Sequence, residues 1–507
     1  MEVYIQDFNR GYSLVTLKRI LFLTNYLADH FLRYIFLRVF LINPPADNGV
    51  KQVREGRCMQ RAGAWTAIWT PISLAYCAAV LRKEGVEVRL VDCIVDEIDF
   101  IGLEKDVEVF KPDLAVLNVV TPSFLSDLST VQFIKKVNPE IKTAVIGIHG
   151  TALPDVCFNE ESLLDFVVRG EPEYAVCSLA SAIKNGTNLL EVDGISYKEG
   201  GKIIHNRDST PVANLDDLPF PAYDLINHEK YTMPFTNKKF LLVASGRGCP
   251  YPCTYCADHV YYGKKMRFRS PEHLADELSF YKKEYGIEDF LFWSEGFTLM
   301  PSVAKSFARE IISRNLKIRW VCNSRVDNVD KELLLLFKKA GCTAIGYGIE
   351  SGVQEILDKV KKGITLNQIR EAVVLTKDVG IDVVAHTIIG LPGDSHETIN
   401  ETVNFLIDLD VDFTQFYCAV PFPGSPLFKE ATEKGWINTG DWRMFEQNFS
   451  VLDMPGLSAE EIMKIREQAY RKFYFRPKTI IKTLKRIRSF KELVKFKSMV
   501  GDFLKWF

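Results

Sequence analysis

The sequence lacks a long uncharged apolar run. Its most apolar stretch, "TLKRILFLTNYLADHFLRYIFLRVFLINPP", lies near the N-terminus and is interrupted by Lys18, Arg19, Asp29, Arg33 and Arg38. No uncharged run approaches the ~18 residues that a membrane-spanning helix needs, and the stretch does not fit a signal peptide. The pattern predicts an amphipathic helical extension over residues 1–35 that leads into a strand. A segment upstream of the true start codon is the alternative.

Cysteine is sparse and does not form a disulfide framework. The chain has 11 cysteines among 507 residues, and apart from one trio they stand singly, at Cys58, Cys77, Cys93, Cys157, Cys177, Cys322, Cys342 and Cys418. Isolated thiols in a long chain are typical of a reducing compartment. We therefore expect a cytoplasmic protein.

Net charge is also nearly absent. A formal charge of −2 argues against nucleic-acid binding across the whole surface, and we expect no nucleic-acid partner. From Arg471 to Phe507, however, Lys and Arg outnumber Asp and Glu twelve to two, a local charge of +10. After Pro477 apolar residues recur at helical spacing with lysines between them, which is typical of a helix lying on the inner membrane surface. A helix packed on the protein with a solvated basic face is the alternative.

The length predicts two or three domains. Over residues 36–205 apolar strand-like runs alternate with helical patterns, which indicates a doubly wound, Rossmann-like α/β domain whose sheet is covered on both faces. "GISYKEGGKIIHNRD" predicts a hairpin that turns at Gly200-Gly201. Ligands of such sheets lie beyond the strand carboxyl ends, and the residues there are candidates for cofactor binding, although turn residues are the simpler interpretation: Thr121, Ser123, Gly147, His149 and Gly150.

A Pro- and Asp-rich linker over residues 206–236 separates this domain from a second alternating series. Six strand–helix units over 237–430 predict a partial (β/α)6 TIM-like barrel, and residues 431–507 predict a helical C-terminal region with the basic tail. Active residues of barrels cluster where strands end. The polar, glycine and proline residues at those ends are Glu295, Asn323, Arg325, Glu350, Gly390 and Pro392.

The segment "GRGCPYPCTYCADH" follows the first barrel strand and contains Cys249, Cys253 and Cys256. Three thiolates at this spacing can hold three irons of a 4Fe–4S cubane, which leaves the fourth iron open to chelate an amino and a carboxylate group of a substrate. Structural zinc would need a fourth ligand, for which His259 is the nearby candidate.

This motif resembles that of the radical S-adenosylmethionine (SAM) superfamily, with the aromatic Tyr255 before the third cysteine. "AIGYGIESG", "IIGLPGD" and "FWSEGFT" resemble the superfamily's fourth-strand, fifth-strand and second-strand segments. The resemblance implies that the three cysteines bind the cluster and that the Tyr255 backbone faces the adenine. It implies that Glu295, Asn323, Arg325 and Glu350 border SAM and substrate, with Arg325 paired to the SAM carboxylate, and that the Gly390–Pro392 turn walls the cofactor.

The same resemblance implies radical chemistry. A reduced cluster would cleave SAM to a 5′-deoxyadenosyl radical, which removes hydrogen from an unactivated carbon. It also implies an external low-potential electron donor, flavodoxin or ferredoxin.

The domain order over about residues 36–480 resembles the cobalamin-binding subclass, whose members include the anaerobic magnesium-protoporphyrin ester cyclase, hopanoid-modifying enzymes and C-methyltransferases. One feature departs from many corrinoid proteins, because none of the eight histidines sits in Asp-x-His-x-x-Gly. Cobalamin would then bind with its own base coordinated or its lower face open; a domain that has lost cobalamin is the alternative. Cys58 lies in the loop "VREGRCMQRAGAWTAIW" and is a further catalytic candidate, with a free buried cysteine as the simpler interpretation.

We therefore expect a radical SAM enzyme with cobalamin that modifies an inert carbon of a hydrophobic small molecule. The reaction would be C-methylation, oxidative cyclisation or carbon–carbon bond formation on a lipid, terpenoid or tetrapyrrole. The alternatives are a methylthiotransferase acting on tRNA or protein and a non-catalytic corrinoid or redox sensor.

Overall fold

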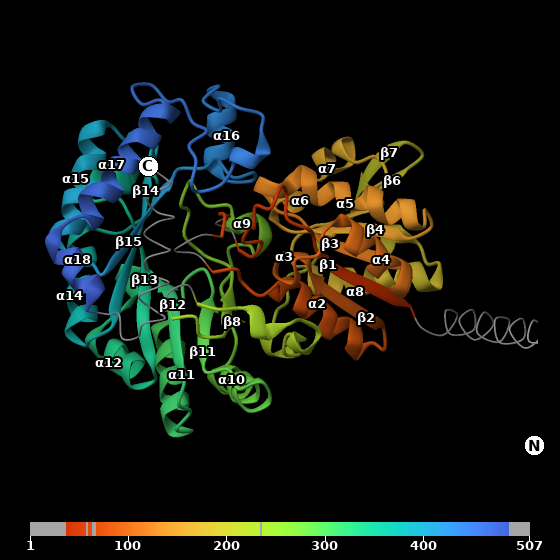
Figure 1. Cartoon of the computed structure of the whole chain (residues 1–507), viewed down its shortest axis with the longest axis horizontal. Coiled ribbons are helices and arrows are strands. Elements are labelled where there is room, and N and C mark those ends of the chain that lie inside the picture. The colour runs from red at the N-terminus through yellow and green to blue at the C-terminus, as the bar shows by residue number, and fades with distance from the viewer. Residues whose placement is uncertain (1–36, 57–58, 63–66, 234–235, 486–507) are drawn as a thin grey trace, which may run out of the picture.

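The computed structural model describes residues 37–56, 59–62, 67–233 and 236–485, which form two lobes joined side by side (Figure 1). The predictions for the N-terminal extension (1–35), for Cys58 and for most of the basic tail (486–507) lie outside the described residues.

The N-terminal lobe is built on a seven-stranded sheet in the order β2-β1-β3-β4-β5-β6-β7. The first five strands in this order are parallel, and β6 and β7 extend the sheet as an antiparallel hairpin. The strands are β1 (Arg38–Asn43), β2 (Glu87–Asp92), β3 (Leu114–Asn118), β4 (Lys142–Ile146), β5 (Phe166–Val168), β6 (Ile195–Glu199) and β7 (Lys202–His205).

Both faces of this sheet are covered, as the apolar strands predict. Along β1, Val39 and Leu41 belong to one hydrophobic core, and Phe40 and Ile42 belong to another, because successive side chains point to opposite faces. Helices α2 and α8 contribute to the first core and α4, α5 and α7 to the second. The helices of this lobe are α2 (Ile72–Lys83), α3 (Cys93–Asp96), α4 (Phe100–Phe110), α5 (Phe124–Val137), α6 (Ile148–Ala152), α7 (Pro154–Glu160) and α8 (Pro172–Asn185).

The predicted hairpin is confirmed. Gly200 and Gly201 connect β6 to β7 with φ of 57° and 78°, the left-handed region that glycine adopts without steric cost.

The linker is packed against both lobes over part of its length. The Tyr223 hydroxyl donates to the Leu242 carbonyl in the barrel at 2.8 Å, and the Tyr231 hydroxyl donates to Asp92 in the N-terminal lobe at 2.7 Å. Both tyrosines are buried. The linker therefore fastens the two lobes together.

The second lobe is a partial barrel of six parallel strands in the order β15-β14-β13-β12-β11-β8, as predicted. These strands are β8 (Phe240–Ala244), β11 (Asp289–Trp293), β12 (Arg319–Ser324), β13 (Cys342–Glu350), β14 (Asp382–Ile389) and β15 (Phe413–Cys418). The barrel helices are α10 (Pro271–Tyr285), α11 (Pro301–Ser313), α12 (Lys331–Lys339), α13 (Gln354–Lys359), α14 (Leu366–Asp378) and α15 (His396–Asp408).

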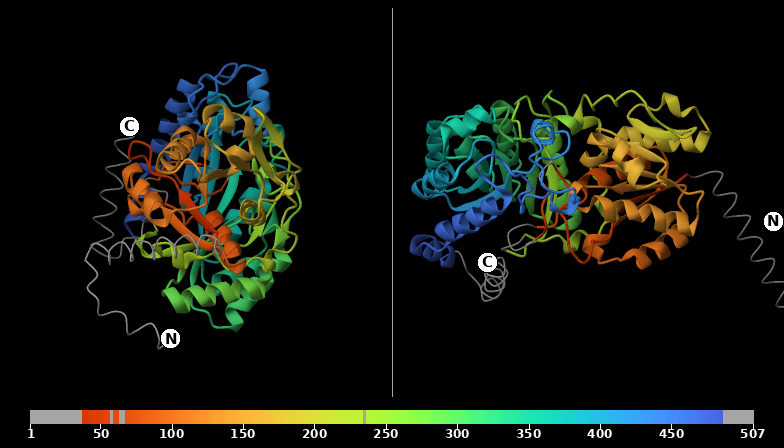
Figure 2. Two further views of the ribbon diagram at one scale, coloured as in Figure 1. Left: turned by 90° about the vertical axis from the view of Figure 1, so that its right-hand side faces the viewer. Right: turned by 90° about the horizontal axis from the view of Figure 1, so that it is seen from above.

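After the barrel come α16 (Pro426–Glu433), α17 (Ala459–Tyr474) and α18 (Pro477–Leu484). Helix α17 begins at a capping box, in which Ser458 and Glu461 satisfy each other's backbone N–H groups. Seen from above in Figure 2, α17 and α18 lie on the side of the barrel away from the N-terminal lobe. Across the part of the chain that the structure describes, every helix is too short or too polar to cross a bilayer.

Candidate functional site

The cysteine loop connects two short strands, β9 (Gly246–Arg247) and β10 (Arg267–Phe268), at the mouth of the barrel. The Cys249 N–H donates to the Gly263 carbonyl at 3.2 Å, and the Thr254 N–H donates to the Val360 carbonyl at 3.0 Å. His259 lies in the short helix α9 (Asp258–Tyr261), and its Nε2 donates to the Cys249 carbonyl at 2.8 Å. His259 therefore braces the loop.

All three cysteines of the motif line one cavity of about 330 Å³ inside the barrel mouth. Five side chains predicted from the sequence line the same cavity, and they come from the cysteine loop and from the ends of β11, β12 and β13: Tyr255, Glu295, Asn323, Arg325 and Glu350. The parallel strands end at one edge, which brings together Tyr255 and Glu350, 95 positions apart in the chain.

The donor chemistry at this cavity fits a cubane. A structural zinc ion would need a fourth ligand, and the nearby candidate, His259, donates from its Nε2 to the Cys249 carbonyl. A cubane takes one thiolate on each of three irons, so its ligands need only surround a shared space, as these cysteines do.

Two glycines of β13 make room for polar bridges inside the cavity. A Cβ at Gly346 would collide with Asn323 and His386, whose Oδ1 and Nε2 lie 3.3 Å apart. A Cβ at Gly348 would collide with Glu350 and Lys362. The "IGYGIE" pattern therefore allows side chains from neighbouring segments to meet over the strand.

The second bridge is a buried ion pair. The Lys362 Nζ donates to Glu350 Oε1 at 2.6 Å and to the Tyr255 hydroxyl at 3.3 Å. Only 7% of the Lys362 side chain and 9% of the Glu350 side chain are exposed. Glu350 has a φ of 63°, a backbone strain found at functional sites. The bridge links the strand end to the residue that precedes Cys256.

Arg325 has most of its donors occupied within the protein. Its Nε and Nη2 each donate to Asp327 at 2.9 Å, and its Nη1 donates to the Lys362 carbonyl at 3.1 Å. The guanidinium also lies 3.5 Å from the centre of the Tyr251 ring, a cation–π contact with the cysteine loop. The geometry therefore favours a role in holding the loop.

The predicted Gly390–Pro392 turn is not brought to the cavity. The N–H groups of Gly390 and Leu391 donate to Asp394 Oδ2 at 3.0 and 2.9 Å, and a Cβ at Gly390 would collide with Ile462 of α17. The turn joins β14 to α15 and packs on the C-terminal region.

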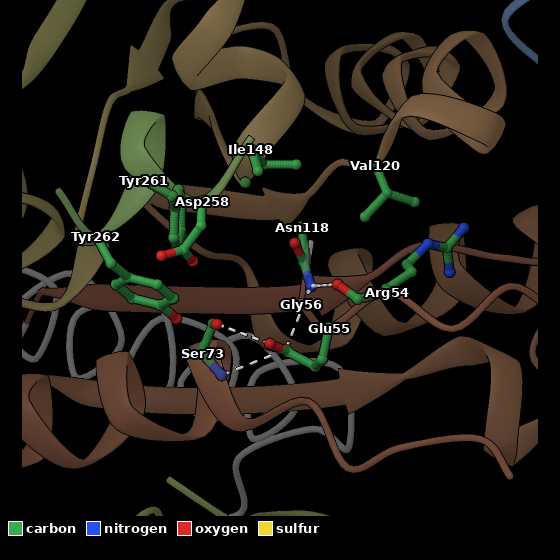
Figure 3. Close-up of a pocket in the computed structure, with 11 residues that line it drawn as sticks. Arg54, Glu55, Gly56, Ser73, Asn118, Val120, Ile148, Asp258, Tyr261 and Tyr262 are labelled. Atoms are coloured by element: carbon green, nitrogen blue, oxygen red, sulfur yellow. Dashed lines mark hydrogen bonds between the residues drawn. The ribbon is translucent and has the colours of Figure 1, made fainter. Parts of the chain in front are cut away.

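The carboxyl edge of the N-terminal sheet faces α9 across a second, much smaller cavity of about 20 Å³ (Figure 3). Glu55 lies here, and its carboxyl oxygens accept from the Ser73 hydroxyl at 2.8 Å and the Ser73 N–H at 3.3 Å. Burial raises the pKa of Glu55 to about 8. Tyr261, Tyr262 and Asp258 line the opposite side.

Of the five candidates at this edge, only Gly147 lines the small cavity. Its φ is 116°, and a Cβ would collide with the Val119 carbonyl. The others face elsewhere: the Ser123 hydroxyl donates to Asp127 at 2.7 Å, the Thr121 hydroxyl bonds His149 Nδ1 at 3.1 Å, and Gly150 packs on Val167.

His149 is enclosed by aromatic rings. It stacks on Phe124 with ring centres 4.0 Å apart and meets the edge of Trp442 at 4.9 Å. Burial lowers the pKa of His149 to about 3, so the ring is neutral. Its Nε2 has no hydrogen-bond partner among the described residues. The surroundings suit a packing role.

Most residues that line this cavity are glycine or uncharged polar residues, which suits the amide side chains of cobalamin. The cavity itself holds about one water molecule. Arg54, Glu55 and Gly56 of the loop that precedes α2 line this cavity together with the sheet edge.

Several cavity residues escaped the sequence analysis, namely Trp69, Trp293, Lys362, His386, Gln415 and Tyr417. The signal that could have found Lys362 and His386 is the Gly-x-Gly pattern of β13, since each glycine accommodates a bridge from a neighbouring segment.

Comparison with known proteins agrees with both lobes. Residues 243–406 match the radical SAM superfamily, and residues 63–180 match the B12 binding domain. An uncharacterized methyltransferase of Pyrococcus horikoshii is 31% identical over 448 residues, 88% of this chain and 95% of the relative. The anaerobic magnesium-protoporphyrin IX monomethyl ester cyclase of Rubrivivax gelatinosus is 29% identical, over 86% of this chain and 77% of the relative.

Among solved structures, the radical S-adenosylmethionine methyltransferase TsrM from Kitasatospora setae, with cobalamin and a 4Fe–4S cluster bound, superposes with a TM-score of 0.69. The match covers 93% of this chain and 99% of TsrM at 16% identity, so the likeness is one of fold.

Proposed function

The chain belongs to the radical SAM superfamily, in the branch that carries a B12-binding domain, and from this premise we propose that it modifies an unactivated carbon of a hydrophobic small molecule. It is an enzyme of the cobalamin-dependent methyltransferase or cyclase type, and its cofactors are a 4Fe–4S cluster, SAM and cobalamin. In this proposal residues 36–205 carry cobalamin and residues 237–430 carry the cluster and SAM.

The observation that carries the proposal is the convergence of three cysteines and a polar rim on one barrel cavity. When bound, a reduced cluster supplies the electron that cleaves SAM and yields the radical that abstracts hydrogen. The chain's own residues bind and orient. Cys249, Cys253 and Cys256 hold the cluster. The buried Lys362–Glu350 pair fixes Tyr255, which lies between Cys253 and Cys256 in the chain.

We assign Glu295, Asn323 and Glu350 to the rim that borders SAM and substrate. Arg325 acts as a positioning residue, because its fork is bound to Asp327 and its planar face lies on Tyr251. This assignment replaces the pairing with the SAM carboxylate that the resemblance implied.

A hydrophobic substrate is supported by the cavity wall on the side of β8 and β11. Trp69 and Trp293 lie with ring centres 5.1 Å apart, and Met233, Phe240 and Leu291 continue the apolar surface. Such a wall favours a ligand that gains free energy by leaving water.

The experiment that tests the proposal compares Cys253→Ala with Cys177→Ala, a half-buried thiol outside the barrel cavity. After anaerobic reconstitution, Cys253→Ala should lose cluster absorbance and reductive cleavage of SAM to 5′-deoxyadenosine, and Cys177→Ala should keep both. Full cleavage by Cys253→Ala would reject the cluster assignment. A wild-type protein that binds cluster and cobalamin but never cleaves SAM would instead be a corrinoid or redox sensor.

We further propose a low-potential flavodoxin or ferredoxin as electron donor and a membrane contact through the C-terminal tail. The first turns of that tail lie in α18, where Ile480, Ile481 and Leu484 are exposed. Deleting residues 478–507 should release the protein from anionic liposomes and leave SAM cleavage in solution unchanged. Equal liposome binding by the shortened chain would refute the contact.

A further inference from the structure

The barrel cavity has one apolar and one polar wall, on different strands. The apolar wall lies at β8 and β11, as described above. The polar wall is formed by Asn323 of β12, His386 of β14, and Gln415 and Tyr417 of β15. In the sheet order β12 and β13 lie between β11 and β14, so His386, Gln415 and Tyr417 line a different part of the cavity from the side chains of β8 and β11.

The polar wall is connected by hydrogen bonds. The Tyr417 hydroxyl donates to Oε1 of the Gln415 side chain. His386 Nδ1 lies 3.4 Å from the Tyr417 hydroxyl oxygen, and His386 Nε2 lies 3.3 Å from Asn323 Oδ1. A neutral imidazole donates from one ring nitrogen, and the side-chain amides of Asn323 and Gln415 bring further N–H groups to the wall.

Both contacts of His386 are long compared with the usual ~2.9 Å for N–H to oxygen. Little free energy is lost if a ligand oxygen accepts from the His386 N–H in place of its present partner. His386 is only half-buried, so part of its ring is open to the cavity. Gly346 supports the arrangement, because a side chain there would fill the space between Asn323 and His386.

We propose that this polar wall binds an oxygen acceptor, a carbonyl or carboxylate, on an otherwise apolar substrate. The inference rests on the proposed function and narrows its substrate class. The apolar body would lie against Trp69 and Trp293, and the oxygen against His386. Hydrogen bonds to His386 would then fix which carbon faces the site of radical formation.

The test uses the reconstituted enzyme with SAM present and three small probes of one size, namely 2-naphthoate, 2-methylnaphthalene and 2-naphthylmethylammonium. Wild type should bind 2-naphthoate at least tenfold more tightly than the other two, as measured by equilibrium dialysis. Tenfold corresponds to about 1.4 kcal/mol, within reach of one or two hydrogen bonds to a buried ligand.

Variants test whether His386 and Tyr417 cause the preference for 2-naphthoate. His386→Leu should reduce the preference for 2-naphthoate to less than threefold, Tyr417→Phe should reduce it partly, and His386→Asn, which keeps a donor, should retain more of it than the leucine variant. His396→Leu is the matched control, since His396 is an exposed histidine on α15. Substrate-free cleavage of SAM by His396→Leu should stay within threefold of wild type.

Two results would overturn the inference. One is an unchanged preference for 2-naphthoate in His386→Leu. The other is a loss of SAM affinity in that variant equal to the loss of 2-naphthoate affinity, which would assign the wall to the SAM pocket. Failure of the proposed function itself would show separately, as absence of 5′-deoxyadenosine from wild type.

Discussion

Among individual side chains, Glu55 sits in an unusual electrostatic environment, a carboxyl group enclosed between the two lobes. Desolvation, aided by the negative charges of Asp92 and Glu173 and opposed by the bonds from Ser73, raises the pKa of Glu55 from 4.5 to about 8. At neutral pH the folded protein therefore holds this carboxyl protonated, whereas the unfolded chain ionises it.

This difference predicts a pH-dependent stability. Between the unfolded pKa and the folded pKa the unfolded state binds fewer protons, so stability falls as pH rises, by at most about 1.4 kcal/mol per pH unit. The loss is complete above about pH 8 and absent below about pH 4.5. Glu55→Gln should remove it. The variant should gain on the order of 2 kcal/mol relative to wild type between pH 6 and pH 8, as measured by denaturant unfolding. If the difference in unfolding free energy between Glu55→Gln and wild type stayed constant from pH 6 to pH 8, the raised pKa of Glu55 would be contradicted.

Among individual residues, the sequence identifies those whose own residue type indicates the chemistry. It misses those whose role depends on a contact with another residue. Cys249, Cys253 and Cys256 are recognisable because three thiols lie within eight positions. His386 and Lys362 are ordinary in isolation, and their meaning comes from contacts with Asn323 and Glu350, 63 and 12 positions away. Asp327 likewise accepts hydrogen bonds from Arg325 that the sequence analysis assigned to the SAM carboxylate, and the spacing of the residues does not predict this pairing.

Among the elements, strand β13 could be predicted from the sequence, but the role of its glycines could not. All six barrel strands were predictable, because apolar runs alternate with amphipathic helices along the chain. The glycines of β13 weaken a strand, so their presence indicates a close approach by other groups. The structure identifies those groups as two bridges inside the cavity.

Gly348→Ala tests this view of β13. The new Cβ would lie 2.6 Å from Glu350 Oε1 and 2.8 Å from Lys362 Nζ, so the buried pair must separate or shift. We expect a several-fold weaker affinity for SAM, measured by equilibrium dialysis on the reconstituted protein, with far-ultraviolet circular dichroism unchanged. Gly380→Ala is no suitable control, because Gly380 has a φ of 76°.

A better control is Gly440→Ala, where a Cβ meets no other atom within 4 Å and the backbone φ is not positive. This variant should match wild type in SAM affinity. If Gly348→Ala also matched wild type, the ion pair would have no part in cofactor binding.

At the scale of the whole molecule, the lobes are joined by a buried cluster of four charges. Arg247 donates to Glu171 at 3.0 Å and to Glu173 at 2.5 and 3.2 Å, and Arg267 pairs with Glu171 as well. The glutamates stand in the first turn of α8 and just before it, while the arginines flank the cysteine loop on β9 and β10. None of the four side chains is more than 6% exposed.

This cluster lets the N-terminal lobe hold the loop that carries the cysteines, because Arg247 lies two residues before Cys249. Its charges balance, two positive against two negative, which is the condition under which burial of ions is tolerated. Removing one partner leaves a buried charge without compensation, whereas removing an opposite pair does not.

Glu173→Gln should therefore lower the unfolding free energy by about 3 kcal/mol, and the thermal midpoint of the cluster-loaded protein by roughly 3 °C. Asp224→Asn is the matched control, since it breaks an ion pair between Arg82 and Asp224 whose side chains are 45% and 47% exposed. Exposed pairs contribute less than about 1 kcal/mol, so this midpoint should move by at most about 1 °C. The double variant Glu173→Gln/Arg247→Gln should recover at least half of the loss, because the two removed charges compensate each other. Two results would show that the cluster does not fasten the cysteine loop to the N-terminal lobe. One is a Glu173→Gln variant as stable as the control. The other is a double variant whose loss of unfolding free energy equals the sum of the losses in Glu173→Gln and Arg247→Gln.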